Sequence, residues 1–211
     1  MTATRFGSAP RVKILYEDRR TADRHFRLHD FVLANTLDVL RGSGTAIEMY
    51  QLVSLIEKIP KGANGDVLRA LAQDAERLHG GYSAIVVWLD DDKVHKALGL
   101  QKKPSTDKLI EEIRKRVPTS LRADAVWIHL LHGNVEEFLR RIDAAQPGSL
   151  DEDTLAEALD KVLTARDLCF RTAAAERHSA WRKAVRDADP GFDETIRYLA
   201  DLAARETWPP W

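Results

Sequence analysis

Short apolar runs alternate along this chain with segments whose apolar residues recur at helical spacing. The clearest run is AIVVWL, Ala84 to Leu89, which leads directly into Asp90, Asp91 and Asp92. A continuous apolar run rich in Ile and Val is typical of a central strand covered on both faces. We therefore expect a buried strand over 84–89 that ends at three carboxylates.

The same pattern predicts a series of strands separated by helices. The strand candidates are 12–16, 48–55, 84–89 and 125–131. Helical spacing is found over about 21–40, after the turn-rich loop 60–66 (PKGANGD), after Ser105 and from about Val135. Strands that alternate with helices pair in parallel through right-handed crossovers. The predicted fold class is α/β, an open, mainly parallel sheet flanked by helices.

The pattern changes at Gln146-Pro147-Gly148. Ser149 and Glu152 have the spacing of a capping box, and helical periodicity follows to about residue 205, interrupted at Pro190-Gly191. The predicted organisation is a loose leader over 1–10, the α/β domain over 11–145, an all-helical C-terminal extension over 149–205, and a Trp/Pro tail over 206–211.

Composition describes an ordinary soluble globular protein of 211 residues with 44% hydrophobic residues. The 32 Lys and Arg against 33 Asp and Glu residues give a formal net charge of −1, so contact with nucleic acid would depend on local basic patches. One cysteine excludes an internal disulfide and fits a reducing compartment. No run is long enough to span a membrane and no secretory leader is visible, so we expect a cytoplasmic protein without a membrane partner.

Acidic residues follow the predicted strands. Glu17 ends the first strand, Asp90 and Asp92 follow the central one, and Glu136 and Glu137 open the helix after the last. Because the carboxyl ends of parallel strands meet at one edge of a sheet, these side chains are expected to converge there. Carboxylate oxygens suit Mg²⁺ or Mn²⁺ rather than zinc. The alternative is a helix-capping acidic turn without a ligand.

This order of motifs resembles a Toprim domain, closest to the stand-alone relatives of OLD-family nucleases. The matching segments are VKILYE (12–17), IPKGANGD (59–66), AIVVWLDDD (84–92) and HGNVEEFL (132–139). The resemblance implies that Glu17 is a general acid or base beside the metal and that Asp90 and Asp92 bind the ion. Glu136 or Glu137 would be an added ligand. It further implies a Mg²⁺- or Mn²⁺-dependent nuclease of a bacterial defence or repair system.

Two other functions stay open. Asp18 stands where the family has glycine, which favours a catalytically degenerate Toprim subunit that acts as a binding or assembly partner. VKILYED followed by a helix also resembles the opening of a receiver domain, with Asp90 as phosphoacceptor. We rank the receiver hypothesis last, because the gap from Asp18 to Asp90 is long and no later strand ends in the required lysine.

Basic residues lie next to the predicted site. The candidates for binding a nucleic-acid backbone are Arg19, Arg20, Arg24, Arg27 and Lys93. A solvated face is the more usual meaning of such a run. Trp208 and Trp211, near the C-terminus, are expected to fold back on the body or to bind a protein partner together with the C-terminal helices.

Two histidines, His25 and His29, are spaced four apart on the first predicted helix. This spacing suits metal ligands on one helical face. However, His29 falls on the apolar stripe with Phe26 and Leu33, so we expect a partly buried histidine rather than a metal ligand.

Overall fold

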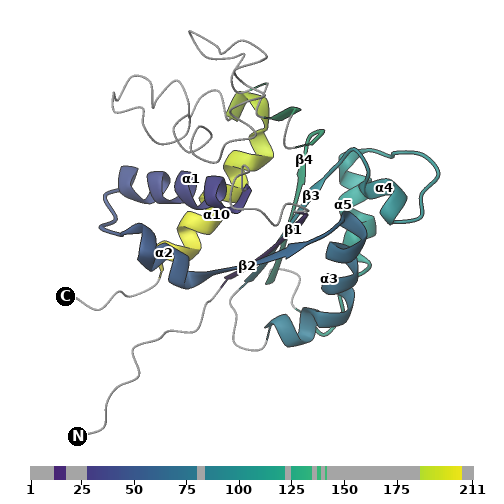
Figure 1. The fold of residues 1–211 in the computed structure, drawn as a ribbon, viewed down its shortest axis with the longest axis horizontal. Helices are drawn as coiled ribbons and strands as arrows, with labels where there is room; N and C mark the ends of the chain where they lie inside the picture. Colours follow the sequence, from purple (N-terminus) through teal and green to yellow (C-terminus); the bar gives the residue numbers. More distant parts are fainter. Residues whose placement is uncertain are drawn as a thin grey trace, which may run out of the picture.

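The chain folds around a four-stranded, all-parallel sheet with the strand order β2-β1-β3-β4 (Figure 1). This computed structural model describes residues 12–17, 28–79, 84–121, 125–134, 137–138, 141 and 186–205. The strands are β1 (Val12–Glu17), β2 (Ile56–Lys61), β3 (Ala84–Asp90) and β4 (Val126–Leu131). The predicted fold class, an open parallel α/β sheet flanked by helices, is confirmed.

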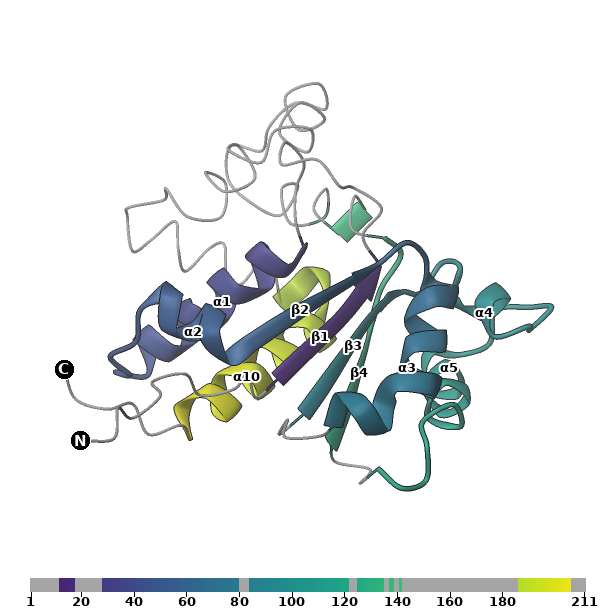
Figure 2. The ribbon, with the colours of Figure 1, turned by 60° about the horizontal axis from the view of Figure 1, so that its bottom comes forward.

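Helices cover both faces of the sheet (Figure 2). One face carries α1 (Leu28–Gly42), α2 (Met49–Leu55) and α10 (Pro190–Ala204). The other carries α3 (Asn64–His79), α4 (Val94–Ala97) and α5 (Thr106–Arg114). Each face therefore buries its own core, and the sheet is the middle layer of three.

The strand sequences supply side chains to both cores by simple alternation. In β3, Val86 and Trp88 belong to the core under α1 and α10, whereas Ile85, Val87 and Leu89 belong to the core under α3 and α5. Every residue from 84 to 89 is buried. The continuous apolar run that predicts this strand is thus explained by burial on both faces.

The predicted strand over 48–55 is wrong, because residues 49–55 form helix α2 and the strand begins at Ile56. The backbone N–H of Glu48 donates a hydrogen bond of 2.7 Å to Oε1 of Gln51, as in a capping box. Leu52 and Leu55 are then buried on one helical face, while Tyr50 and Val53 are exposed. Short apolar runs fit either a helix or a strand, and here the cap at Glu48 favours the helix.

The predicted loop 60–66 is shorter in the structure. Pro60 and Lys61 complete β2, and α3 already begins at Asn64. Within the described sheet β2 pairs only with β1, so it is an edge strand, where a proline without an N–H is tolerated.

The C-terminal part is described only from residue 186, where the predicted last helix is confirmed as α10. Its residues Ile196, Leu199 and Ala203 are buried in the same core as α1 and the sheet. The residues 149–185, the leader 1–10 and the tail with Trp208 and Trp211 lie outside the described residues, so the predicted domain boundaries stay a prediction. Among the helices that the structure describes, none is long and apolar enough to cross a membrane.

Candidate functional site

The strands β1 and β3 end side by side at one edge of the sheet. Their parallel register pairs Val12 with Ala84 and Tyr16 with Trp88, so Glu17 and Asp90 both lie where these strands end. Asp90 is in turn aligned with Leu131, the last residue of β4. The structure therefore brings Glu17 and Asp90 to the same edge, the position in which α/β sheets bind ligands.

Asn64, the first residue of α3, connects these two strand ends. Its backbone N–H donates a hydrogen bond of 3.1 Å to Oε2 of Glu17, and its Nδ2 donates one of 3.2 Å to the backbone carbonyl of Asp90. The residue is only 5% exposed, and its Oδ1 has no hydrogen-bond partner among the described residues. A buried acceptor without a partner is costly unless a water or an ion satisfies it. The sequence places Asn64 in the segment 59–66 that carries the resemblance, but it does not identify Asn64 as a site residue.

Asp92 has a simpler environment. Its Oδ2 lies 3.6 Å from Nζ of Lys93, and the lysine side chain is mostly exposed. Such exposed pairs contribute little to stability. Lys93, which the sequence predicts to bind nucleic acid, therefore forms an exposed ion pair with Asp92.

Asp91, between the two predicted ligands, is the most buried of the three acids at 2% exposure. Its Oδ1 accepts a hydrogen bond of 2.8 Å from the backbone N–H of Gly133 and lies 2.8 Å from Nζ of Lys103. Burial raises the pKa of Asp91, but the hydrogen bonds from Lys103 and Gly133 and the charges of Lys103 and His132 outweigh it. The net pKa therefore lies below the ordinary value of 3.8.

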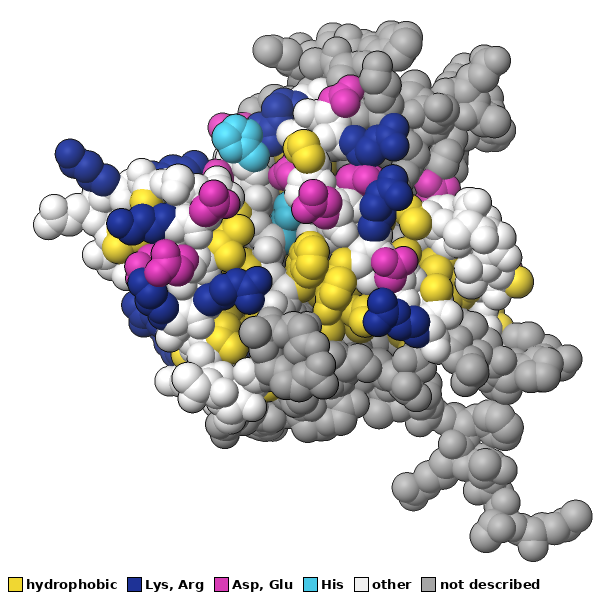
Figure 3. All heavy atoms as spheres, turned by 180° about the vertical axis from the view of Figure 1, so that it is seen from behind, with side chains coloured by type: hydrophobic (Ala, Val, Ile, Leu, Met, Phe, Trp, Pro, Cys, Tyr) yellow, Lys and Arg dark blue, Asp and Glu magenta, His cyan; other side chains and the backbone are white. Residues whose placement is uncertain are grey.

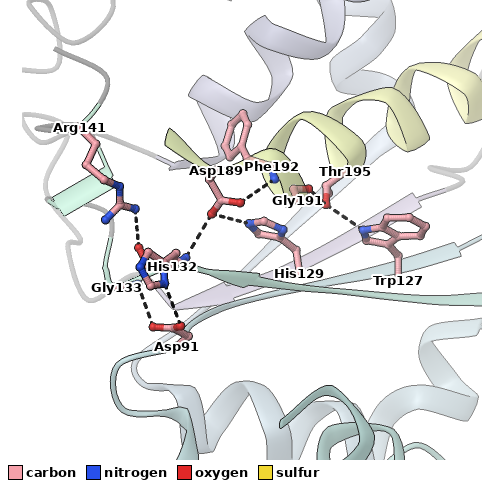
Figure 4. A network of polar contacts seen from close by, with 10 residues as sticks. All are labelled: Asp91, Trp127, His129, His132, Gly133, Arg141, Asp189, Gly191, Phe192 and Thr195. Carbon is pink, nitrogen blue, oxygen red and sulfur yellow. Dashed lines mark hydrogen bonds and ion pairs between the residues drawn. The ribbon is translucent and has the colours of Figure 1, made fainter. Parts of the chain in front are cut away.

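His132 follows β4 and is held from several sides (Figure 4). Its backbone N–H donates a hydrogen bond of 3.2 Å to Oδ2 of Asp189, and its carbonyl accepts one of 2.6 Å from Arg141. The ring Nδ1 lies 3.4 Å from Oδ2 of Asp91, while the side chain as a whole is 73% exposed. His132 thus combines a fixed backbone with a solvent-facing ring.

Gly133 permits the turn that follows. Its φ of +79° lies in the left-handed region, and a Cβ at this position would overlap Oε2 of Glu137. Oδ1 of Asn134 then accepts a hydrogen bond of 2.9 Å from the N–H of Glu137, as an N-cap does. Glu137 is therefore placed beside the end of β4, while Glu136 lies outside the described residues.

Beneath this turn, His129 on β4 is buried against Trp88 and Phe192, with ring centroids 4.3 and 6.2 Å away. Its Nε2 lies 3.8 Å from Oδ2 of Asp189, too far for a hydrogen bond, and has no other partner among the described residues. Burial lowers the pKa of His129 to about 4, although the Asp189 charge and a hydrogen bond with the Gly191 backbone oppose it. His129 is accordingly neutral near pH 7.

The structure does not describe the predicted arginine residues of the site. Arg19, Arg20, Arg24 and Arg27 lie outside the described residues. In the part of the chain that is described, no group of three or more His, Cys, Asp or Glu side chains could hold a metal ion. Basic and acidic side chains are interspersed on the face shown in Figure 3. The described residues of that face therefore form no broad patch of a single charge.

The predicted burial of His29 is confirmed. The residue is 4% exposed, Nδ1 lies 2.7 Å from the Tyr16 hydroxyl, and Nε2 lies 3.1 Å from Nζ of Lys58. It is a buried histidine with polar partners.

No protein-family model, no curated protein and no solved structure matches this chain.

Proposed function

We propose that this protein is a Mg²⁺- or Mn²⁺-dependent phosphodiesterase of the Toprim type that acts on nucleic acid. One observation carries the proposal: Glu17 and Asp90 end adjacent parallel strands at the same edge of the sheet and are joined through Asn64. This is the relationship that the resemblance requires of a proton-transferring glutamate and a metal-binding aspartate.

The oxygen atoms at this edge fit a hard cation. Asp90, Asp92 and Glu17 would hold the ion, and the buried Oδ1 of Asn64, without a partner among the described residues, is a suitable acceptor for a metal-bound water. The described residues do not by themselves supply three convergent ligands. Glu137 is one of the described residues, so the proposal takes Glu136, which lies outside them, as the further ligand. When bound, the cation would polarise the phosphodiester and lower the pKa of a coordinated water.

In this proposal Glu17 accepts the proton of the attacking water. The hydrogen bond from the N–H of Asn64 holds its carboxylate at the start of α3, so the base is positioned before a substrate arrives. A general base must lie within hydrogen-bond reach of the proton that it removes. Arg19, Arg20, Arg24 and Arg27, close to Glu17 in sequence, would bind the phosphate backbone of a cytoplasmic nucleic acid.

A second candidate is a catalytically degenerate subunit that binds a partner. It is favoured by the lysines that already form ion pairs with two of the acids: Lys103 lies 2.8 Å from Asp91 and Lys93 lies 3.6 Å from Asp92. Acids neutralised in this way need no bound ion. Trp208 and Trp211 would then be the residues that contact the partner protein.

A nuclease assay with and without chelator separates the two functions. Full-length protein is incubated with single- and double-stranded DNA and RNA in Mg²⁺ or Mn²⁺, beside the variants Asp90→Asn and Asp107→Asn. Asp107 is an exposed acid in the first turn of α5 that is not one of the acids at the strand ends, and it serves as the matched control. We expect cleavage by the wild type and by Asp107→Asn, and none by Asp90→Asn or in chelator. Absence of cleavage on every substrate would contradict the nuclease proposal and favour the binding subunit.

A further inference from the structure

His132 has features that packing alone does not explain. Its side chain is 73% exposed, yet Nδ1 faces the buried carboxylate of Asp91 at 3.4 Å. Its backbone is bonded on both sides, to Asp189 through the N–H and to Arg141 through the carbonyl (Figure 4). An exposed side chain normally loses more in conformational entropy than a surface contact returns. Fixing the backbone on both sides reduces the freedom that remains to the ring.

Asp91 is itself held in place. The N–H of Gly133 and the ammonium group of Lys103 both contact Oδ1, so Oδ2 is the oxygen that faces His132. A carboxylate that faces Nδ1 orients the imidazole and leaves Nε2 on the opposite side of the ring. Since the His132 side chain is largely exposed, Nε2 is the nitrogen available to a substrate. This is the arrangement in which a carboxylate orients a histidine for proton transfer.

We propose that His132 is a catalytic residue that donates a proton from Nε2 to the leaving oxygen of the phosphodiester, with Asp91 as its positioning residue. This inference rests on the proposed function. That function assigns Glu17 as the general base but names no general acid, and His132 would supply it. His132 begins the segment HGNVEEFL, but the sequence pattern gave it no role, because Asp91 and Asp189 are far from it in the chain.

The order of the strands places the two proton-transfer groups on either side of Asp90. Glu17 ends β1, Asp90 ends the neighbouring β3, and His132 follows β4 on the far side of β3. Neighbouring strands lie about 4.8 Å apart, so β1 and β4 are separated by about 10 Å at this edge. In-line displacement at phosphorus needs the attacking and leaving oxygens on opposite sides of the phosphorus atom. A base at β1 and an acid after β4 satisfy that requirement.

The proposed step is a single displacement at phosphorus. The water oxygen forms a bond to phosphorus while its proton passes to the carboxylate of Glu17. The bond between phosphorus and the leaving oxygen breaks, and that oxygen takes the Nε2 proton of the imidazolium form of His132 to leave as an alcohol, while His132 becomes neutral and keeps its Nδ1 proton toward Asp91. Both residues return to their starting states by exchanging protons with solvent. No oxidant, reductant or further reactant is needed.

The test compares two leaving groups. Cleavage of an oligonucleotide expels a sugar alkoxide, which is strongly basic and needs a proton. Cleavage of bis(p-nitrophenyl) phosphate expels p-nitrophenolate, which is weakly basic and does not. For His132→Ala we expect kcat on the oligonucleotide to fall about 100-fold, but kcat on bis(p-nitrophenyl) phosphate to fall less than about threefold. Added imidazole should restore part of the lost oligonucleotide activity. Asp107→Asn should match the wild type on both substrates.

The outcomes are distinguishable. An equal loss on both substrates would show a structural role for His132, and no loss on either would show no role; each overturns the inference and leaves the nuclease proposal standing. A wild type that cleaves neither substrate would overturn both proposals together. Because the His132 side chain is exposed, the alanine variant should fold, which its circular dichroism spectrum and thermal midpoint will show. Should it not fold, His132→Gln, which preserves the size of the side chain, replaces it in the same comparison.

Discussion

Oδ2 of Asp189 accepts a hydrogen bond of 3.2 Å from the backbone N–H of His132. Oδ1 of the same carboxylate accepts one of 3.0 Å from the N–H of Phe192 and so caps the N-terminus of α10. A single buried carboxylate therefore starts the last helix and also fixes the chain that follows β4. The helix α10 thereby supports the candidate site as well as the core.

The first prediction concerns this cap. Asp189→Ala removes both hydrogen bonds and leaves two N–H groups without this acceptor, so we expect it to lower the free energy of unfolding by about 2–3 kcal/mol. The control is Ser105→Ala at the start of α5, because the Ser105 side chain makes no capping hydrogen bond in the structure. Ser105→Ala should change the free energy by less than about 0.5 kcal/mol. Urea unfolding of both variants measures the difference, and equal effects would contradict the role of Asp189.

The second prediction concerns pH. His129 has a pKa of about 4 in the folded protein against an ordinary value of 6.5. Between these values the unfolded chain binds the proton and the folded chain does not, so stability falls as pH is lowered from about 6.5 to about 4. The full difference corresponds to a free energy on the order of 3 kcal/mol. Urea unfolding at a series of pH values should show this slope.

His129→Gln removes the titrating group and should flatten the slope between pH 6.5 and 4. Urea unfolding of this variant at the same series of pH values is the direct check. A slope equal to that of the wild type would show that another group is responsible.

The sequence predicts the sheet better than it predicts the site. The run 84–89 identifies the central strand because burial on both faces requires apolar residues at every position. Residues 49–55 were assigned wrongly because a short apolar run fits a helix and a strand equally well, and the cap at Glu48 decides it. The edge that joins Glu17 to Asp90 was predictable, since the strand order brings the ends of parallel strands together.

The network around Asp91 was not predictable in the same way. The hydrogen bond from Gly133 to Asp91 spans 42 positions and the one from His132 to Asp189 spans 57. Periodicity tells which face of an element a residue occupies, but it does not tell which distant segment supplies its partner. The spacing of Asp90 and Asp92 therefore drew attention to the outer two acids, although Asp91 between them is the buried one.

The third prediction separates these acids. Asp91→Ala leaves Lys103 and the N–H of Gly133 without their buried acceptor and should cost about 2–3 kcal/mol of stability. Asp92→Ala removes only the 3.6 Å contact with exposed Lys93, so the metal-free protein should keep its stability to within about 0.5 kcal/mol. We expect Asp92→Ala, like Asp90→Ala, to weaken Mg²⁺ or Mn²⁺ binding. Calorimetry measures that affinity, and a wild type that binds neither ion, with or without nucleic acid, would refute the metal site.

The fourth prediction concerns Glu17→Gln. An amide oxygen can still accept the hydrogen bond that Asn64 donates at 3.1 Å, so the fold and the binding of nucleic acid should be preserved. The substitution removes the negative charge, and with it the ability to take a proton from water. Loss of a general base lowers the rate by about 100- to 10,000-fold. We therefore expect cleavage to fall below detection while the Kd for an oligonucleotide, measured by fluorescence anisotropy, changes less than about threefold. Cleavage at the wild-type rate would exclude Glu17 as the base, and a large rise in Kd would instead indicate a role in binding.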